Sequence, residues 1–149
     1  MLRLSKMTDY AVVVMGRLAS RPDTRQSAAE VAEATGLPGA TVGQVLKAIG
    51  AAGLVHGARG ANGGYVLARR PKEISVAEIV TALDGPVAIT DCVEGVDDPC
   101  AMSRSCLLQG SWNAVNAAIE TALSQVTLAD MLAPLYRFAP PPEAQEART

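Results

Sequence analysis

The chain has 149 residues, of which 49% are apolar, enough to build the core of one domain with an appended element. Its formal net charge of −2 taken alone argues against a nucleic-acid partner. No apolar run approaches the ~18–20 residues that cross a bilayer, and the N-terminus lacks the apolar stretch of a signal peptide, so we expect a cytoplasmic protein with no membrane segment.

Two helices are expected at the start of the chain. The first begins at Thr8–Asp9 and carries apolar residues at helical spacing until Pro22 stops it. The second begins with a capping box. In it, the Ser27 hydroxyl accepts a hydrogen bond from the backbone N–H of Glu30, and the Glu30 side chain reaches back to the backbone N–H of Ser27. Gly36 suits the left-handed conformation that ends such a helix.

The next segment predicts a third helix and a hairpin. Pro38 suits the first turn of this helix, and Gly53 closes it. Two short strands, 54–55 and 65–67, are expected to flank a glycine-rich turn at 59–64. Glycines suit the tip of a hairpin that contacts a DNA phosphate backbone, because such a tip needs residues with positive φ and small side chains. Two short helices followed directly by a hairpin predict a winged helix-turn-helix. The buried stripe of the third helix is expected to contain Val42, Val45, Leu46 and Ile49.

The second half of the chain predicts further helices around an irregular segment. Ser75 and Glu78 form a second capping box for a helix that ends near Asp84. A long amphipathic helix is expected from 107 to 126, and a short helix begins at Thr127. The fold class is therefore mainly α with a small β-wing. The chain divides into a winged domain with its supporting helix (1–84), a cysteine-bearing loop (85–106), the long and short helices (107–138) and a disordered tail (139–149).

The charge distribution and the third helix together predict DNA binding. Residues 1–75 carry ten Lys and Arg against five Asp and Glu, about +5, whereas residues 76–149 carry three against ten, or −7. Thr41, Gln44 and Lys47 lie opposite the buried stripe, where Thr and Gln suit base edges and Lys suits phosphate. Arg59 at the wing tip suits a minor groove. Further backbone contacts are expected from Lys6, Arg69, Arg70 and Lys72.

The cysteines point to an inorganic centre. Cys92, Cys100 and Cys106 all lie in one short polar loop, and an odd number in a cytoplasmic chain is a poor disulfide framework. Thiolates select zinc, copper(I) or iron–sulfur clusters. Zinc knuckles usually separate paired ligands by two to four residues. The wider spacings here, seven and five residues, favour an iron–sulfur cluster, with structural zinc as the alternative.

A cluster of this kind normally takes four protein ligands, and the loop supplies three. His56, just before the wing, fits a surface or DNA-facing position better than a ligand position. Gln109 is a poor substitute for an imidazole. Asp9 is the remaining candidate if it reaches a cluster across a dimer. The alternative is that Asp9 only complements the N-terminus of its helix, worth about 0.3–1 kcal/mol.

Several strings together have the pattern of one known family: Leu4–Ala11, Gly53–Val55, Arg59–Ala68, Ile74–Ile79, the three cysteines and Val126–Asp130. On these residues, the chain from Met1 to Met131 resembles the IscR-like winged-helix regulators, which include NsrR, RirA and the SUF-system iron–sulfur assembly regulators. The strings Leu83–Pro86 and Gly110–Trp112 are most similar to the SUF-system subgroup.

The resemblance implies a homodimer formed through a long crossed dimerisation helix, matching residues 107–126. It implies that the three cysteines bind a 2Fe–2S or 4Fe–4S cluster, and that Arg59 and the third helix contact double-stranded DNA. Gln109 stands where IscR has a histidine ligand, whereas Asp9 matches an aspartate that NsrR-type members use. Gly43 replaces a glutamate of the IscR recognition helix, so the base preferences of IscR are not carried over.

We therefore expect a dimeric transcriptional regulator that senses cluster status, iron, redox or nitric oxide signals and controls iron–sulfur assembly genes. One alternative is a DNA-binding regulator with structural zinc or a thiol-redox switch. Another is an iron–sulfur electron-transfer protein, which leaves the basic winged half unexplained. An enzyme with a cysteine nucleophile is disfavoured, because the lone His56 lies in a different element and no nucleotide-binding glycine loop is present.

Overall fold

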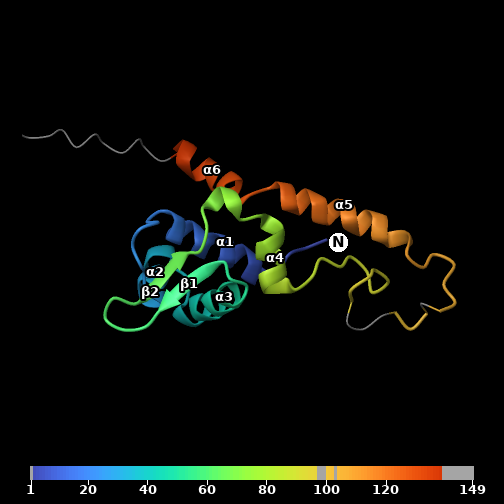
Figure 1. The fold of residues 1–149 in the computed structure, drawn as a ribbon, viewed down its shortest axis with the longest axis horizontal. Coiled ribbons are helices and arrows are strands. Elements are labelled where there is room, and N and C mark those ends of the chain that lie inside the picture. Colours follow the sequence, from blue (N-terminus) through green and yellow to red (C-terminus); the bar gives the residue numbers. More distant parts are fainter. Residues whose placement is uncertain (1, 97–99, 103, 139–149) are drawn as a thin grey trace, which may run out of the picture.

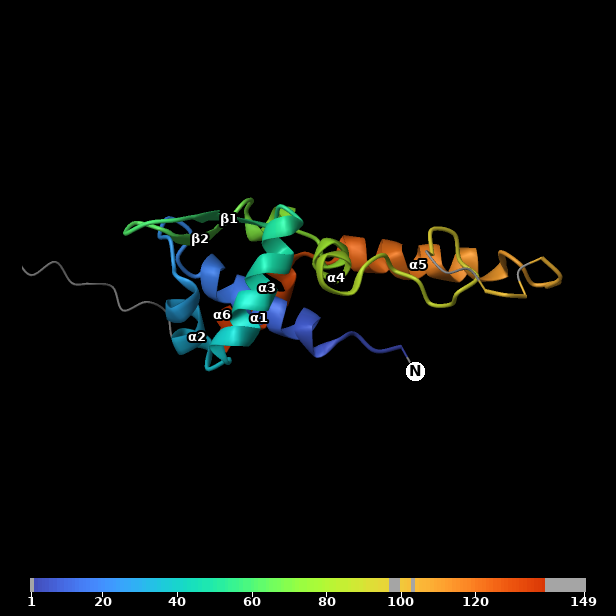
Figure 2. The same ribbon diagram turned by 90° about the horizontal axis from the view of Figure 1, so that it is seen from below.

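The computed structural model describes residues 2–96, 100–102 and 104–138. It consists of a compact winged head, from which one long helix and the cysteine loop project as an arm (Figure 1). Figure 2 shows the same division from below, with the wing at one end of the molecule and the arm at the other. The predicted mainly α fold with a small β-wing is confirmed.

The first two helices follow the sequence prediction with one difference. Helix α1 spans Lys6–Ala19 and so begins two residues before Thr8, because Ser5 is its cap and accepts a hydrogen bond from the backbone N–H of Thr8 at 3.2 Å. Helix α2 spans Ala28–Thr35 and carries the predicted capping box. Gly36 ends it in the left-handed region, with φ 73°.

Helix α3 forms the centre of the head. It spans Gly39–Ala51, with Pro38 as its N-cap rather than in its first turn. All members of the predicted apolar stripe are buried. They form one core with the inner face of α1, contributed by Ala11, Val14, Met15 and Leu18. Burying this face leaves the opposite face of α3 at the surface.

The wing is docked on the head by its backbone. Strands β1 (Val55–Ala58) and β2 (Gly64–Leu67) pair antiparallel. The backbone of Tyr65 exchanges two hydrogen bonds with that of Gln26, at 2.8 and 3.1 Å. Gly64 has φ 129°, and a Cβ there would lie 2.8 Å from the Gln26 backbone. The glycine at this position is therefore required by the head itself, and the expected need to fit a phosphate backbone does not explain it.

Helix α4 connects the head to the arm. The turn η1 (Pro71–Glu73) precedes α4 (Val76–Asp84), which has the predicted Ser75 capping box. After the cysteine loop, α5 spans Ser111–Gln125. It is shorter than the predicted 107–126, because Gly110 adopts φ 77° and residues before it form turns instead of helix.

The chain then returns to the head. Helix α6 spans Leu128–Phe138 and starts with reciprocal hydrogen bonds between Thr127 and Asp130. Two backbone hydrogen bonds of 2.8 Å tie this junction to the start of α4. Leu132 is buried and packs closely on Gly16. A Cβ added to Gly16 would lie 2.8 Å from the Leu132 Cδ2 atom. The expected tail at 139–149 lies outside the described residues. None of the described helices combines the length and apolar character needed to cross a membrane.

One carboxylate fixes the end of α4 to the start of α1. Oδ2 of Asp84 accepts hydrogen bonds from the Ser5 backbone N–H at 3.1 Å and the Thr8 hydroxyl at 2.9 Å. Burial acts to raise the pKa of Asp84, but these hydrogen bonds outweigh it and hold the pKa below its ordinary 3.8. The next residue, Gly85, has φ 84° and turns the chain into the cysteine loop. The loop therefore departs from a point that is fixed relative to α1.

Replacing Gly64 by alanine is expected to lower the free energy of unfolding by about 2–4 kcal/mol, because the new Cβ meets rigid backbone and the residue keeps a strained φ. Urea denaturation measures the change. The control is Gly43→Ala, at an exposed mid-helix position with open space. It is expected to raise stability by about 0.5–1 kcal/mol. If Gly64→Ala unfolds at the wild-type urea concentration, the wing is not docked in this way.

The Asp84 contact predicts a pH-dependent stability. Because the folded pKa lies below the unfolded one, the stabilisation is complete above the unfolded pKa and is lost as the pH falls through the folded pKa. Asp84→Ala is therefore expected to reduce the free energy of unfolding at neutral pH and to change it little once the native carboxyl is protonated. Urea denaturation at neutral pH and at an acidic pH below the folded pKa tests this. An equal loss at both would rule out the carboxylate charge as the cause.

Candidate nucleic-acid interface and cysteine site

The predicted DNA-contacting residues of α3 lie on its outer face. Gln44 and Lys47 are exposed and Thr41 is half-buried. Apart from Gln44 and Lys47, the exposed residues of α3 are all Gly or Ala. Little side-chain bulk therefore separates the helix backbone from a ligand. The wing lies beside α3 (Figure 1), and Arg59 is exposed immediately after β1. The structure thus brings the helix and wing candidates onto neighbouring surfaces.

All four outlying basic candidates, Lys6, Arg69, Arg70 and Lys72, are exposed, but they differ in whether their charges are already paired. Lys6 is exposed at the first position of α1. Arg69 is also exposed, but its guanidinium donates to the Glu73 carbonyl at 2.7 Å and pairs with the Glu78 carboxylate at 2.5 Å. This pairing holds the end of the wing on α4. Part of the Arg69 charge is therefore already neutralised within the head.

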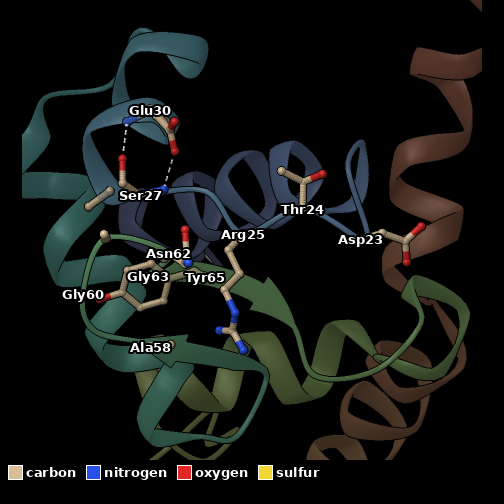
Figure 3. Close-up of a pocket in the computed structure, with 13 residues that line it drawn as sticks. Asp23, Thr24, Arg25, Ser27, Glu30, Ala58, Gly60, Asn62, Gly63 and Tyr65 are labelled. Atoms are coloured by element: carbon tan, nitrogen blue, oxygen red, sulfur yellow. Dashed lines mark hydrogen bonds between the residues drawn. The ribbon is translucent and has the colours of Figure 1, made fainter.

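A polar hollow of about 810 Å³ lies between the wing and the N-terminus of α2 (Figure 3). Its cation is Arg25, while Asp23 and Glu30 carry negative charge. The backbone and side-chain hydrogen bonds of Ser27 hold the pKa of Glu30 below its ordinary 4.5, so this carboxylate is charged at neutral pH. Glu30 also accepts from the Ser27 N–H at 2.7 Å. The backbone N–H groups of Ser27 and Glu30 are thus already engaged, and the Glu30 carboxylate opposes a phosphate at this end of α2.

The cysteine loop runs alongside α5, away from the wing (Figures 1 and 2). Cys92, Cys100 and Cys106 are free thiols and all are half-buried. The Cys100 backbone N–H donates to the Asp91 carbonyl at 3.1 Å, which places Cys100 next to the Cys92 turn. The structure therefore brings two segments of the loop, separated in sequence, together at the thiols.

The thiols also interact with one another. Burial, the hydrogen bond with Cys100 and the proximity of Cys106 raise the pKa of Cys92 above its ordinary 9.0, against the opposing effect of the Thr90 hydroxyl. Two neighbouring thiolates would repel each other, so the proximity of Cys100 favours the protonated thiol form of Cys92. Soft sulfur donors of this kind fit an iron–sulfur cluster in their chemistry.

A complete ligand set is not assembled within one chain. Among the described residues, no group of three or more His, Cys, Asp or Glu side chains is arranged to hold a metal ion. His56 is exposed on β1, in the wing, which lies at the other end of the molecule from the loop. Asp9 is exposed on α1, in the head. Gln109 is exposed and donates its backbone N–H to the Cys106 carbonyl at 3.2 Å. Residues 97–99 and 103 of the loop lie outside the described residues.

The sequence analysis missed the residues that hold this loop in place. Asp84 anchors its beginning, and Asn113 and Asn116 of α5 bind its backbone. One available signal was Asn116, a polar residue three and four positions from Ile119 and Trp112 in the apolar stripe of the long helix. A polar residue inside such a stripe indicates a buried hydrogen-bonding role.

Comparison with known proteins identifies the family. A family model described as Rrf2, iron-dependent transcriptional regulator, matches residues 4–134. The chain is 33% identical over 134 residues to the HTH-type transcriptional repressor NsrR of Streptomyces coelicolor, covering 89% of each chain. IscR of T. potens superposes with a TM-score of 0.65 at 31% identity, over 95% of this chain and 94% of that one.

A second solved structure has the same architecture. CymR, named as the global cysteine regulator of B. subtilis, superposes with a TM-score of 0.67 at 28% identity, over 90% of this chain and 98% of that one. The family description thus names iron and the CymR title names cysteine, so the shared fold alone does not identify the signal. Their shared character as transcriptional regulators confirms the expectation that the protein is not an enzyme. The chain belongs to the Rrf2 family of winged-helix, DNA-binding transcriptional regulators.

Proposed function

We propose that this protein is a homodimeric regulator whose DNA affinity is set by an iron–sulfur cluster on Cys92, Cys100 and Cys106. The observation that carries the proposal is that the backbone holds Cys100 next to the Cys92 turn, with Cys106 half-buried in the same loop, in a chain that matches a family described as iron-dependent transcriptional regulators. When bound, a cluster supplies a link between its ligands that responds to iron and to oxidants. The sequence resemblance to the SUF-system subgroup points to iron–sulfur assembly genes as targets.

The cysteines would bind as thiolates, so each must lose its proton on loading. Asp9 is proposed as the fourth ligand, donated by the other subunit, because it is exposed on α1 and no described hydrogen bond engages its side chain. Carboxylate oxygen is a harder donor than sulfur and binds a soft centre less firmly. A ligand of this kind makes one corner of the site easier to exchange than the other three.

The dimer is proposed from the exposed apolar face of α5. Trp112, Val115 and Val126 are 45%, 44% and 38% exposed, and they recur at helical spacing. Leu107 and Leu108 just before the helix are also exposed. An apolar stripe of this length is suited to packing against a second copy of the same helix. Two heads joined in this way suit operator half-sites about one DNA turn apart.

The coupling between arm and head follows from chain continuity. The cysteine loop leaves α4 at Gly85, next to the Asp84 contact with α1, and it rejoins the head through α5 and α6. Ordering or releasing the loop therefore changes how α5 sits on α4, and with it the spacing of the two heads in a dimer. Coupling energies of about 1–3 kcal/mol are typical of such switches.

The contact between Cys92 and Cys100 also favours a second candidate, a thiol-redox switch in the metal-free protein. In that case the two thiols lose two protons and two electrons to a peroxide, which is reduced to water, and a disulfide forms. The alternative with structural zinc keeps the same DNA-binding surface. Metal analysis together with an anaerobic absorption spectrum distinguishes the three.

The cluster is tested by anaerobic reconstitution with iron and sulfide. The wild type is expected to gain visible absorption with stoichiometric iron and sulfide, and Cys100→Ala is expected to lose it, because two remaining thiols cannot hold a cluster. His56→Ala, in the wing, is the control and should load fully. Asp9→Ala is expected to load but to release the cluster faster. Full loading of Cys100→Ala would contradict the ligand assignment, and zinc in place of iron would favour the structural alternative.

The DNA-contacting residues are tested by binding measurements at several salt concentrations. Lys47→Ala is expected to weaken binding to all sequences alike and to reduce the log–log salt slope by about one phosphate contact, close to 0.9. Gln44→Ala is expected to leave the slope unchanged and to reduce discrimination at one base pair by about 1–3 kcal/mol. Equal effects of the two substitutions on slope and specificity would contradict these roles.

A further inference from the structure

Asn116 is an exception on its helix. Helix α5 lies along the edge of the molecule, and among its described residues Asn116 is the one that is buried, at 9% exposure. The apolar residues Trp112 and Val115, which precede it on the helix, are far more exposed. A helix that buries an amide in preference to a tryptophan does so for a polar contact, because a buried amide without partners costs about 1–3 kcal/mol.

The partners of Asn116 are backbone groups of the cysteine loop. The backbone N–H of Ile89 donates to its Oδ1 at 3.0 Å, and its Nδ2 donates to the carbonyl oxygen of Val87 at 2.8 Å. One carboxamide thus satisfies a donor and an acceptor two residues apart on the loop, as a neighbouring β-strand would. These contacts fix the position of the backbone at 87–89 and do not depend on the loop side chains.

A second asparagine holds the other side of Cys92. Asn113 lies three residues before Asn116, so that both side chains project from the same face of α5. Its Oδ1 accepts from the backbone N–H of Glu94 at 3.3 Å. Val93, adjacent to Cys92, is buried at 6% exposure. Cys92 therefore sits between two points at which the loop is fastened to the helix.

The other two cysteines are held differently. The described hydrogen bonds at Cys100 and Cys106 run within the loop, to the Asp91 carbonyl and from the Gln109 N–H. In the described part of the loop, the hydrogen bonds to α5 thus lie around Cys92 and not around its two companions. Cys92 is the ligand whose place is set before any cluster is present.

We propose that Asn116 is a positioning residue that seats the Cys92 segment on α5, with Asn113 in support. This inference rests on the proposed function, because the placement of Cys92 has a consequence only if Cys92 is a ligand. Through these amides, a change in the loop is transmitted directly to the helix proposed to join the two subunits. Asn116 itself does not contact the cluster.

The first test uses the full-length protein without metal. Asn116→Ala is expected to speed hydrogen exchange at the Ile89 amide by about tenfold or more, the effect of losing a buried hydrogen bond. It is also expected to raise the rate at which iodoacetamide modifies Cys92 relative to Cys106, measured by peptide mass spectrometry. Gln125→Ala removes an exposed amide from the same helix and serves as the matched control. It should change neither quantity.

The second test loads the same variants anaerobically with iron and sulfide. Asn116→Ala is expected to alter the visible circular dichroism of the cluster and to weaken its retention by about 10–100-fold, as loss of an outer-shell partner does. If exchange and Cys92 reactivity match those of the control, the inference is overturned. It is also overturned if exchange rises while the cluster spectrum and retention stay unchanged, since Asn116 would then be only a structural tie.

A variant that does not fold and a wild type that takes up no cluster are distinguished by further measurements. If Asn116→Ala does not fold, judged by far-ultraviolet circular dichroism, Asn113→Ala decides, because this half-buried residue contributes one hydrogen bond and its loss should speed exchange at Glu94 with the fold intact. If the wild type takes up no cluster, the proposed function fails. The metal-free exchange and thiol reactivities then still show whether Asn116 holds the Cys92 segment.

Discussion

The packing of α3 against α1 is the constraint on which the other functional surfaces depend. Val42, Val45, Leu46 and Ile49 are all buried in a core that α1 completes, so α3 has only one face left to offer. That face carries Gln44 and Lys47 among glycines and alanines. The wing is then fastened beside it by the backbone pairing of Gln26 with Tyr65. The surface proposed to contact DNA thus results from burying the opposite side of the same helix.

The arm depends on polar contacts more than on apolar packing. The carboxylate of Asp84 holds the start of the cysteine loop to α1, and backbone pairing between the starts of α4 and α6 holds the far end of α5. Between these anchors, the amides of Asn113 and Asn116 bind the loop. Such contacts are directional, which suits an element that is proposed to switch between two arrangements.

Local interactions made much of the fold predictable. The capping boxes at Ser27 and Ser75 and the four-residue stripe of α3 were read directly and are confirmed, because each involves residues three or four apart on one helix. The start of α5 was misplaced, because the left-handed conformation of Gly110 breaks a pattern whose apolar period continues through it. The three cysteines were identifiable from the sequence as a candidate site, because cysteines clustered in one polar loop indicate a metal or redox site.

By itself, the amino-acid sequence determined the helix starts at the two capping boxes, the winged architecture, the family, and the candidate ligands and candidate DNA-contacting side chains. Only the tertiary structure decided which polar residues join the loop to the rest of the molecule. The Asp84–Thr8 and Asn116–Val87 hydrogen bonds join residues 76 and 29 positions apart. No periodicity records such a pairing, because whether a carboxylate or an amide meets its partner depends on how the helices that carry them pack.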